Sequence, residues 1–193
     1  MSIISIPHIS KPKLISLAIA TSSLALTILI AVSGTEAVVA KTATAKLTDA
    51  KKQAIGTIQF TETPKGLQAI VQVQGLNPGE HAIHIHEHGK CEPPNFLSAG
   101  KHFDPLKSTQ TNKKKSEKNP GQKPAGDLPN IQVKSDGTGT LTAILTGLTL
   151  GTGNNSLLKP GGTAVLIHAG ANGKSTIPGV DAKVRIACGV VTP

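Results

Sequence analysis

Histidines are concentrated in one short stretch of this chain, from Gly79 to Pro105. Four of the seven histidines of the chain lie there within eight residues, and a fifth follows near the end of the stretch: His81, His84, His86, His88 and His102. Imidazole nitrogens are ligands of zinc, copper, nickel and iron in proteins. This density of imidazole therefore points to metal binding, and any remaining ligands must come from elsewhere in the chain.

The stretch begins with a predicted strand, Glu80 to His88. Side chains alternate between the two faces of a strand, so His84 and His86 share one face and Ile83 and Ile85 share the other. The isoleucines would enter the core, which leaves both imidazoles on the outer wall. Alternate residues on one face lie about 6.5–7 Å apart, so both rings can reach one ion. Packing alone can also produce such a pair.

Two further histidines could complete a site. His102 lies in a glycine-containing loop, and His168 ends a short apolar strand. A site of four imidazoles suits copper, whose oxidised form accepts near-square geometry. His81 lies on the opposite strand face by parity, so we expect it to make a structural hydrogen bond. His88, at the end of the strand, is expected at the surface, with metal contact as the alternative.

The elements that position these histidines are short strands. Aromatic residues make up only 2% of the chain, so the core must come from Ile, Val, Leu and Ala, and 20 glycines and 13 prolines mark many turns. Besides the histidine strand, alternating or apolar runs predict strands at Lys41–Asp49, Ala54–Thr61, Leu67–Val73, Asn130–Val133, Thr138–Leu145, Ala164–His168 and Val184–Val191.

This pattern predicts an all-β fold, a Greek-key barrel or sandwich of about eight antiparallel strands. Two long loops, Cys91–Pro129 and Gly170–Ala182, are expected to carry function. The polar middle of the first loop, Ser108–Lys123, is expected to be a solvated tip.

The first forty residues are expected to lie outside this domain. Lys11 and Lys13 precede an apolar run over residues 14–32, and small residues at positions 37–40 suit a signal peptidase. A secretory signal peptide is the first interpretation, and a membrane anchor through the apolar run is the alternative. Both place a domain of residues 41–193 in the periplasm, at the cell surface or outside the cell.

The formal net charge is +9 at pH 7. The lysines are spread along the chain and there are almost no aromatic side chains to stack on bases, so nucleic acid is not an expected partner. A general attraction for small anions or for an anionic cell surface fits the charge better.

Cys91 and Cys188 are the only cysteines of the chain. In an exported protein an even number of cysteines predicts a disulfide, with two buried free thiols as the alternative. The bond would tie the loop that carries His102 to the last strand, where Arg185 lies three residues before Cys188.

Five motifs in order, PGEHAIHIHEHGKC, SAGKHFDP, AGDLPN, VLIH and RIACGVV, resemble the copper–zinc superoxide dismutase family, above all its exported bacterial members. The resemblance runs from about Thr42 to the C-terminus. It implies a Greek-key β-barrel that disproportionates superoxide to dioxygen and hydrogen peroxide by alternate reduction and oxidation of copper.

The resemblance also implies roles for single residues. The four copper ligands of the family are matched by His84, His86, His102 and His168. His102 also matches the histidine that bridges copper and zinc. Cys91 and Cys188 match the family disulfide, and Arg185 matches the arginine that guides superoxide to copper.

The zinc half of the family site is incomplete in this sequence. Only His102 and Asp127 match zinc ligands; Pro124 stands where a histidine precedes the aspartate by three residues, and the other histidine has no counterpart. Asn172 stands near the family's aspartate that links the two metal shells. A structural zinc site normally needs four protein ligands, so we expect copper alone, with Asp127 or Asp104 orienting His102.

The sequence thus predicts an exported copper-dependent superoxide dismutase, a monomer or homodimer whose partner is the superoxide anion. The alternative is a copper-binding or copper-buffering protein on the same fold, motivated by the incomplete zinc half. Arg185 favours the enzyme, because a buffer has no evident need of it.

Overall fold

The computed structural model describes residues 40–105 and 123–193. The predictions for residues 1–39, and those for all of Ser108–Lys123 except Lys123 itself, fall outside the described residues. No helix in the described ranges has the length and apolar character that a membrane crossing requires.

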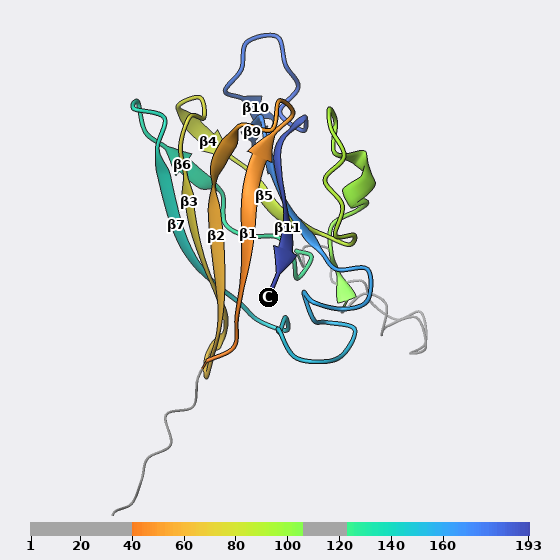
Figure 1. The fold of residues 1–193 in the computed structure, drawn as a ribbon. Helices are drawn as coiled ribbons and strands as arrows, with labels where there is room; N and C mark the ends of the chain where they lie inside the picture. Colours follow the sequence, from red (N-terminus) through yellow and green to blue (C-terminus); the bar gives the residue numbers. More distant parts are fainter. Residues whose placement is uncertain (1–39, 106–122) are drawn as a thin grey trace, which may run out of the picture. The chain divides into compact units, whose positions relative to one another are not determined.

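Within these ranges, nine strands form one antiparallel sheet that curves into a nearly closed barrel (Figure 1). They are β1 (Thr42–Asp49), β2 (Ala54–Thr63), β3 (Gly66–Val73), β4 (Gly79–His81), β5 (Ile83–His86), β6 (Ile131–Val133), β7 (Gly139–Leu145), β8 (Ala164–His168) and β11 (Arg185–Thr192). Their order is β4-β6-β7-β3-β2-β1-β11-β8-β5. β3 and β4 follow each other in the chain but are separated in the sheet by β7 and β6, a connection of Greek-key type. The predicted fold class is confirmed.

The predicted continuous strand from Glu80 to His88 is wrong in two respects, because the chain changes partner at Ala82 and the strand ends at His86. β4 pairs with β6, whereas β5 pairs with β8 at the other end of the sheet order. Ala82 accepts a hydrogen bond from the His168 amide and donates one to the Gly170 carbonyl. The two outermost strands are therefore joined by a single residue, which brings the ends of the sheet together.

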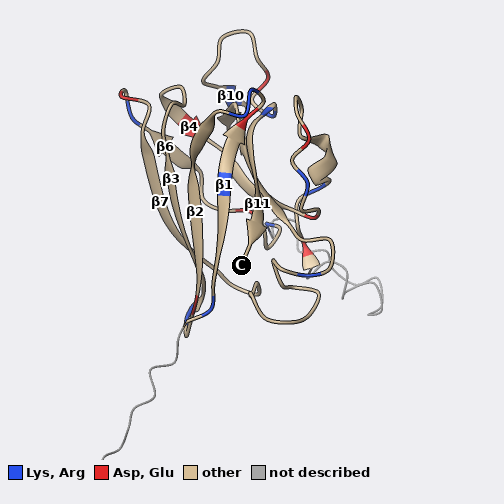
Figure 2. Ribbon diagram, in the orientation of Figure 1, with Lys and Arg blue, Asp and Glu red and all other residues tan. Residues whose placement is uncertain are grey.

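The core lies inside the barrel and is aliphatic, as the composition predicts. Ile83 and Ile85 are fully buried there, as their strand parity predicts, and Val165 and Ile167 of β8 pack in the same cluster. Charged residues lie mainly in turns and loops, while the strands carry few (Figure 2).

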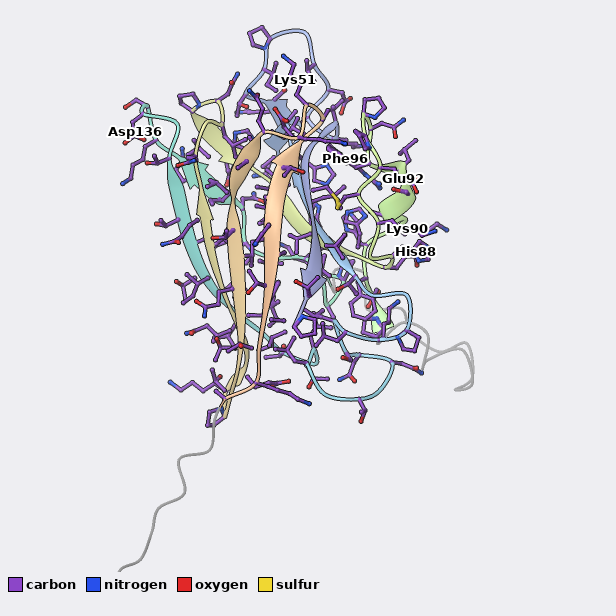
Figure 3. The ribbon with its side chains drawn as sticks, viewed as in Figure 1. Lys51, His88, Lys90, Glu92, Phe96 and Asp136 are labelled. Carbon is purple, nitrogen blue, oxygen red and sulfur yellow. A yellow bond between two sulfur atoms is a disulfide. The ribbon has the colours of Figure 1, made fainter. Side chains whose placement is uncertain are left out.

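The segment after β5 covers the outer face of β5 and β8. It contains a short 3-10 helix, η1 (Leu97–Ala99), and a second small apolar cluster in which Phe96 and Ala99 pack on Leu166 and Cys188. Figure 3 shows His88, Lys90 and Glu92 on the outer side of this segment and Phe96 on the side that faces the barrel. The predicted second loop is more ordered than expected, since it holds a two-stranded hairpin, β9 (Gly170–Ala171) and β10 (Lys174–Ser175).

Core packing in β2 can be tested with a matched pair of variants. Ile58 is completely buried, whereas Ile144 on β7 is 42% exposed. Replacing Ile58 by Ala should lower the free energy of unfolding by about 2–5 kcal/mol, because burial is lost and a cavity remains. Ile144→Ala should cost less than about 1 kcal/mol. Chemical denaturation measures both values, and equal losses would contradict this assignment of the core.

Candidate metal centre

Strand alternation places two of the predicted ligands. In β5 the side chains of Ile83 and Ile85 enter the core, so His84 and His86 project from the outer face. The predicted placement of both imidazoles on the outer wall is confirmed. The segment that follows β5 covers this face, and His86 has no exposed surface.

The other two predicted ligands reach the same place from separate elements. His102 forms an isolated backbone bridge with His86, and His168 ends β8 opposite Arg185 of β11. One ring nitrogen from each of the four histidines, His84, His86, His102 and His168, lies within 4.8 Å of the others. Four imidazoles from distant parts of the sequence therefore converge.

Hydrogen bonds fix the orientation of two of these imidazole rings. The Nδ1–H of His86 donates to the Gly100 carbonyl at 2.9 Å, and that of His168 donates to the Lys183 carbonyl at 2.8 Å. Each donation leaves Nε2 with a lone pair and no proton. Backbone carbonyls of this kind carry no sequence signal, so sequence reasoning did not find Gly100 and Lys183.

The free ring nitrogens fit a metal ion. His84 Nδ1, His86 Nε2 and His168 Nε2 are buried and have no hydrogen-bond partner. Leaving buried polar atoms unpaired is costly and rare in proteins, so three at one point need a common explanation. A cation among the imidazoles would accept all three lone pairs, and a donor set of nitrogen atoms alone suits copper.

Electrostatics keep these rings neutral. Burial, together with the charges of His102 and His168, lowers the pKa of His84 to about 4. Burial lowers the pKa of His86 to about 3, although its hydrogen bond to Gly100 opposes the shift. Burial also lowers the pKa of His168. At neutral pH the lone pairs are therefore available, as a metal ligand requires.

His102 is oriented by Asp127, one of the two predicted candidates. Its Nδ1 lies 2.8 Å from Asp127 Oδ1, and the carboxylate is largely buried. Burial raises the pKa of Asp127, but the hydrogen bond from His102 and the nearby positive charges outweigh it, so the net pKa is lowered. The residue before Asp127 is Gly126, and its backbone packs closely against β5 and the segment at Phe103. A side chain there would clash, since its Cβ would lie 2.8 Å from the carbonyl oxygens of both Ile85 and Phe103.

The described residues do not fit a zinc ion beside His102. The ring nitrogen that would face zinc is hydrogen-bonded to Asp127. Asn172 does not reach the metal ligands; its amide donates to Glu80 Oε2 at 3.0 Å. Among the residues that the structure describes, the four-imidazole group is the sole cluster of potential ligands with three or more members.

Arg185 lines the same cavity as three of the imidazoles, those of His84, His102 and His168. Its guanidinium donates to the Phe96 carbonyl at 2.7 Å and to the Gly100 carbonyl at 2.8 Å. Burial lowers its pKa, yet an arginine stays charged at any physiological pH. The Cys91–Cys188 disulfide is formed and fastens the same segment to β11, as predicted.

The remaining described histidines in the region do not join the cluster. His81 is buried, with Nδ1 2.7 Å from the His168 carbonyl and Nε2 2.8 Å from the Asn77 carbonyl, which confirms a structural hydrogen-bonding role. His88 is exposed and lies 3.6 Å from the Glu87 carboxylate, as expected for a surface residue.

Comparisons with known proteins agree with this geometry. The sequence profile of the family described as copper/zinc superoxide dismutase (SODC) matches residues 54–191. Superoxide dismutase [Cu-Zn] 1 of Aquifex aeolicus is 40% identical over 76% of this chain and 85% of its own.

Two solved structures share the fold. A superoxide dismutase-like protein of Bacillus subtilis, crystallised as a double mutant with two introduced histidines, has a TM-score of 0.63 at 35% identity and covers 76% of this chain and 95% of its own. The Cu/Zn superoxide dismutase of Brucella abortus has a TM-score of 0.57 at 26% identity, over 78% of this chain and 99% of its own. The barrel, the converging imidazoles and these matches together place the chain in the copper/zinc superoxide dismutase family.

Proposed function

We propose that this chain is an exported copper-dependent superoxide dismutase that works without zinc. The reaction consumes two superoxide anions and two protons and gives one dioxygen and one hydrogen peroxide. The observation that carries the proposal is the convergence of four imidazoles, three of them with a buried ring nitrogen that has no hydrogen-bond partner, near Arg185.

The residues that would hold copper are His84, His86, His102 and His168. Copper bound there supplies a one-electron redox couple, which is the chemistry that this reaction requires. The protein keeps the ligand set in place through the carbonyls of Gly100 and Lys183 and the carboxylate of Asp127. Such outer hydrogen bonds orient ligand imidazoles and increase their affinity for a metal.

Arg185 would bind the anionic substrate. Two of its five N–H donors are used on Phe96 and Gly100, so the others remain for a small oxyanion. Both anchoring carbonyls belong to the segment fastened by the disulfide, which gives the charge a fixed position. The excess of lysine over acidic residues in the chain would add a general attraction that salt weakens.

Asp127 supports the proposal of copper without zinc. Its carboxylate accepts the hydrogen bond from His102 Nδ1, the nitrogen that a second metal would need. His102 Nδ1 would thus be bonded to a carboxylate rather than shared with a second ion.

Export is proposed from the sequence. An apolar run over residues 14–32 follows Lys11 and Lys13 and fits a secretory signal peptide or a membrane anchor. Disulfides persist in oxidising compartments, and the Cys91–Cys188 bond agrees with that location. The periplasm, the cell surface and the extracellular medium all satisfy these requirements.

Pulse radiolysis of the copper-loaded chain tests the activity. We expect superoxide to decay far faster than in buffer that holds the metal-free protein. Decay no faster than that of the metal-free control would contradict the enzyme and favour the alternative, a protein that only binds or buffers copper.

Replacing Arg185 tests the role of the guanidinium. Arg185→Ala should lower the rate roughly tenfold while copper affinity stays close to that of the native protein, because the arginine attracts the anion and does not touch the free ring nitrogens. Arg185→Lys should recover part of the rate, since it keeps the charge but not the planar fork. A full rate in Arg185→Ala would contradict this role.

Replacing Asp127 tests the support of His102. Asp127→Ala removes the acceptor for His102 Nδ1, so copper affinity, measured by competition with a chelator, should fall about 10- to 100-fold. Asp104→Ala serves as the matched control, because it removes a nearby carboxylate that does not bond His102, and should leave affinity unchanged. The opposite ranking would show that Asp104 is the orienting group.

A further inference from the structure

The cavity beside His84, His102 and His168 is lined by more cationic than anionic residues. Its volume is about 530 Å³. Three cationic residues line it, namely Lys123, Lys183 and Arg185, and Asp127 is the one carboxylate among its lining residues. An anion of two atoms needs only a small part of this space, so the remaining wall is available for other groups that act on the substrate.

Lys123 stands at the part of this wall where the zinc half of the family site is incomplete. It directly precedes Pro124, and it lines the cavity together with His102 and Asp127. A zinc ion in the family lies beside the counterpart of His102 and brings positive charge there. Here a lysine lines the same cavity as His102 and Asp127.

The positive charge of Lys123 acts on two groups that line the cavity. It lowers the pKa of His84, after the larger effects of burial and of the neighbouring His102 and His168. It also helps to lower the pKa of Asp127, after burial, which acts in the opposite direction, and the bond from His102. The ammonium of Lys123 thus acts on the proposed copper ligand His84 and on Asp127, the carboxylate that is hydrogen-bonded to the ligand His102.

The three cations differ in how firmly they are engaged. The Arg185 guanidinium donates to two carbonyls, as described above. Lys183 is bonded only through its backbone, whose carbonyl accepts from His168 and whose amide donates to Asp181, so its ammonium has no hydrogen bond or ion pair to another described residue. Lys123 likewise makes no hydrogen bond or ion pair to another described residue, and it lines the cavity together with His102 and Asp127.

We propose that Lys123 is a positioning residue for the anionic substrate. Its ammonium supplies positive charge near His102, as a second metal ion would do. This inference rests on the proposed function, because superoxide is the anion concerned. Arg185 and Lys123 then both present positive charge to an anion in this cavity.

The test compares two lysine variants that change the net charge equally. Lys123→Gln removes the ammonium from the cavity wall, whereas Lys65→Gln removes one from the exposed turn between β2 and β3, outside the cavity. Copper-loaded protein is titrated with azide, a small anion that binds at copper, and followed by visible absorption. Pulse radiolysis at low and high salt gives the rates in parallel.

We expect Lys123→Gln to weaken azide binding and to slow superoxide decay about two- to fivefold at low salt, with a smaller effect at high salt. Lys123→Arg should restore both, and Lys65→Gln should change neither beyond the small effect of net charge. Copper affinity should be the same in all variants.

Equal effects of Lys123→Gln and Lys65→Gln, or none in either, would overturn the assignment of Lys123. The azide titration does not depend on turnover, so it decides the role of Lys123 even if the native protein proves unable to disproportionate superoxide. Failure of the proposed function would instead appear as a native protein without activity.

Discussion

The site depends on one constraint: each of four imidazoles must keep a ring nitrogen free of hydrogen bonds and turned toward a common point. A neutral imidazole has one N–H and one lone pair, so the orientation of the ring follows from the group that accepts its proton. His86 and His168 donate to backbone carbonyls, and His102 faces a carboxylate. Without a cation, three buried nitrogens remain unpaired, which is a cost that metal binding removes.

The peptide at Gly100 links the proposed ligands to the proposed substrate guide. Its carbonyl accepts from both the His86 ring and the Arg185 guanidinium, so one metal ligand and one cation are positioned by the same atom. The disulfide and the packing of Phe96 fasten this segment to β8 and β11. At the other side of the cavity, Asp127 holds His102 in a geometry that leaves no free ring nitrogen for a second ion.

Strand parity allowed much of this arrangement to be predicted from the sequence. Alternation fixed which face of β5 holds His84 and which enters the core, and it separated His81 from the ligand face. The break at Ala82 could not be predicted, because it arises from a change of strand partner between β6 and β8 that depends on the closed sheet. The choice between Asp127 and Asp104 also required the structure, since both lie in irregular segments where sequence sets no direction for a side chain.

The metal content of the protein decides whether it binds copper without zinc. Purified metal-free protein is exposed to equal amounts of copper and zinc, freed of unbound metal, and analysed by inductively coupled plasma mass spectrometry. We expect about one copper per chain, because one cluster of imidazoles accepts it, and no zinc beyond background. Zinc bound together with copper in equal amount would show that copper alone is wrong, because it would require ligands beside His102 that the described residues do not offer.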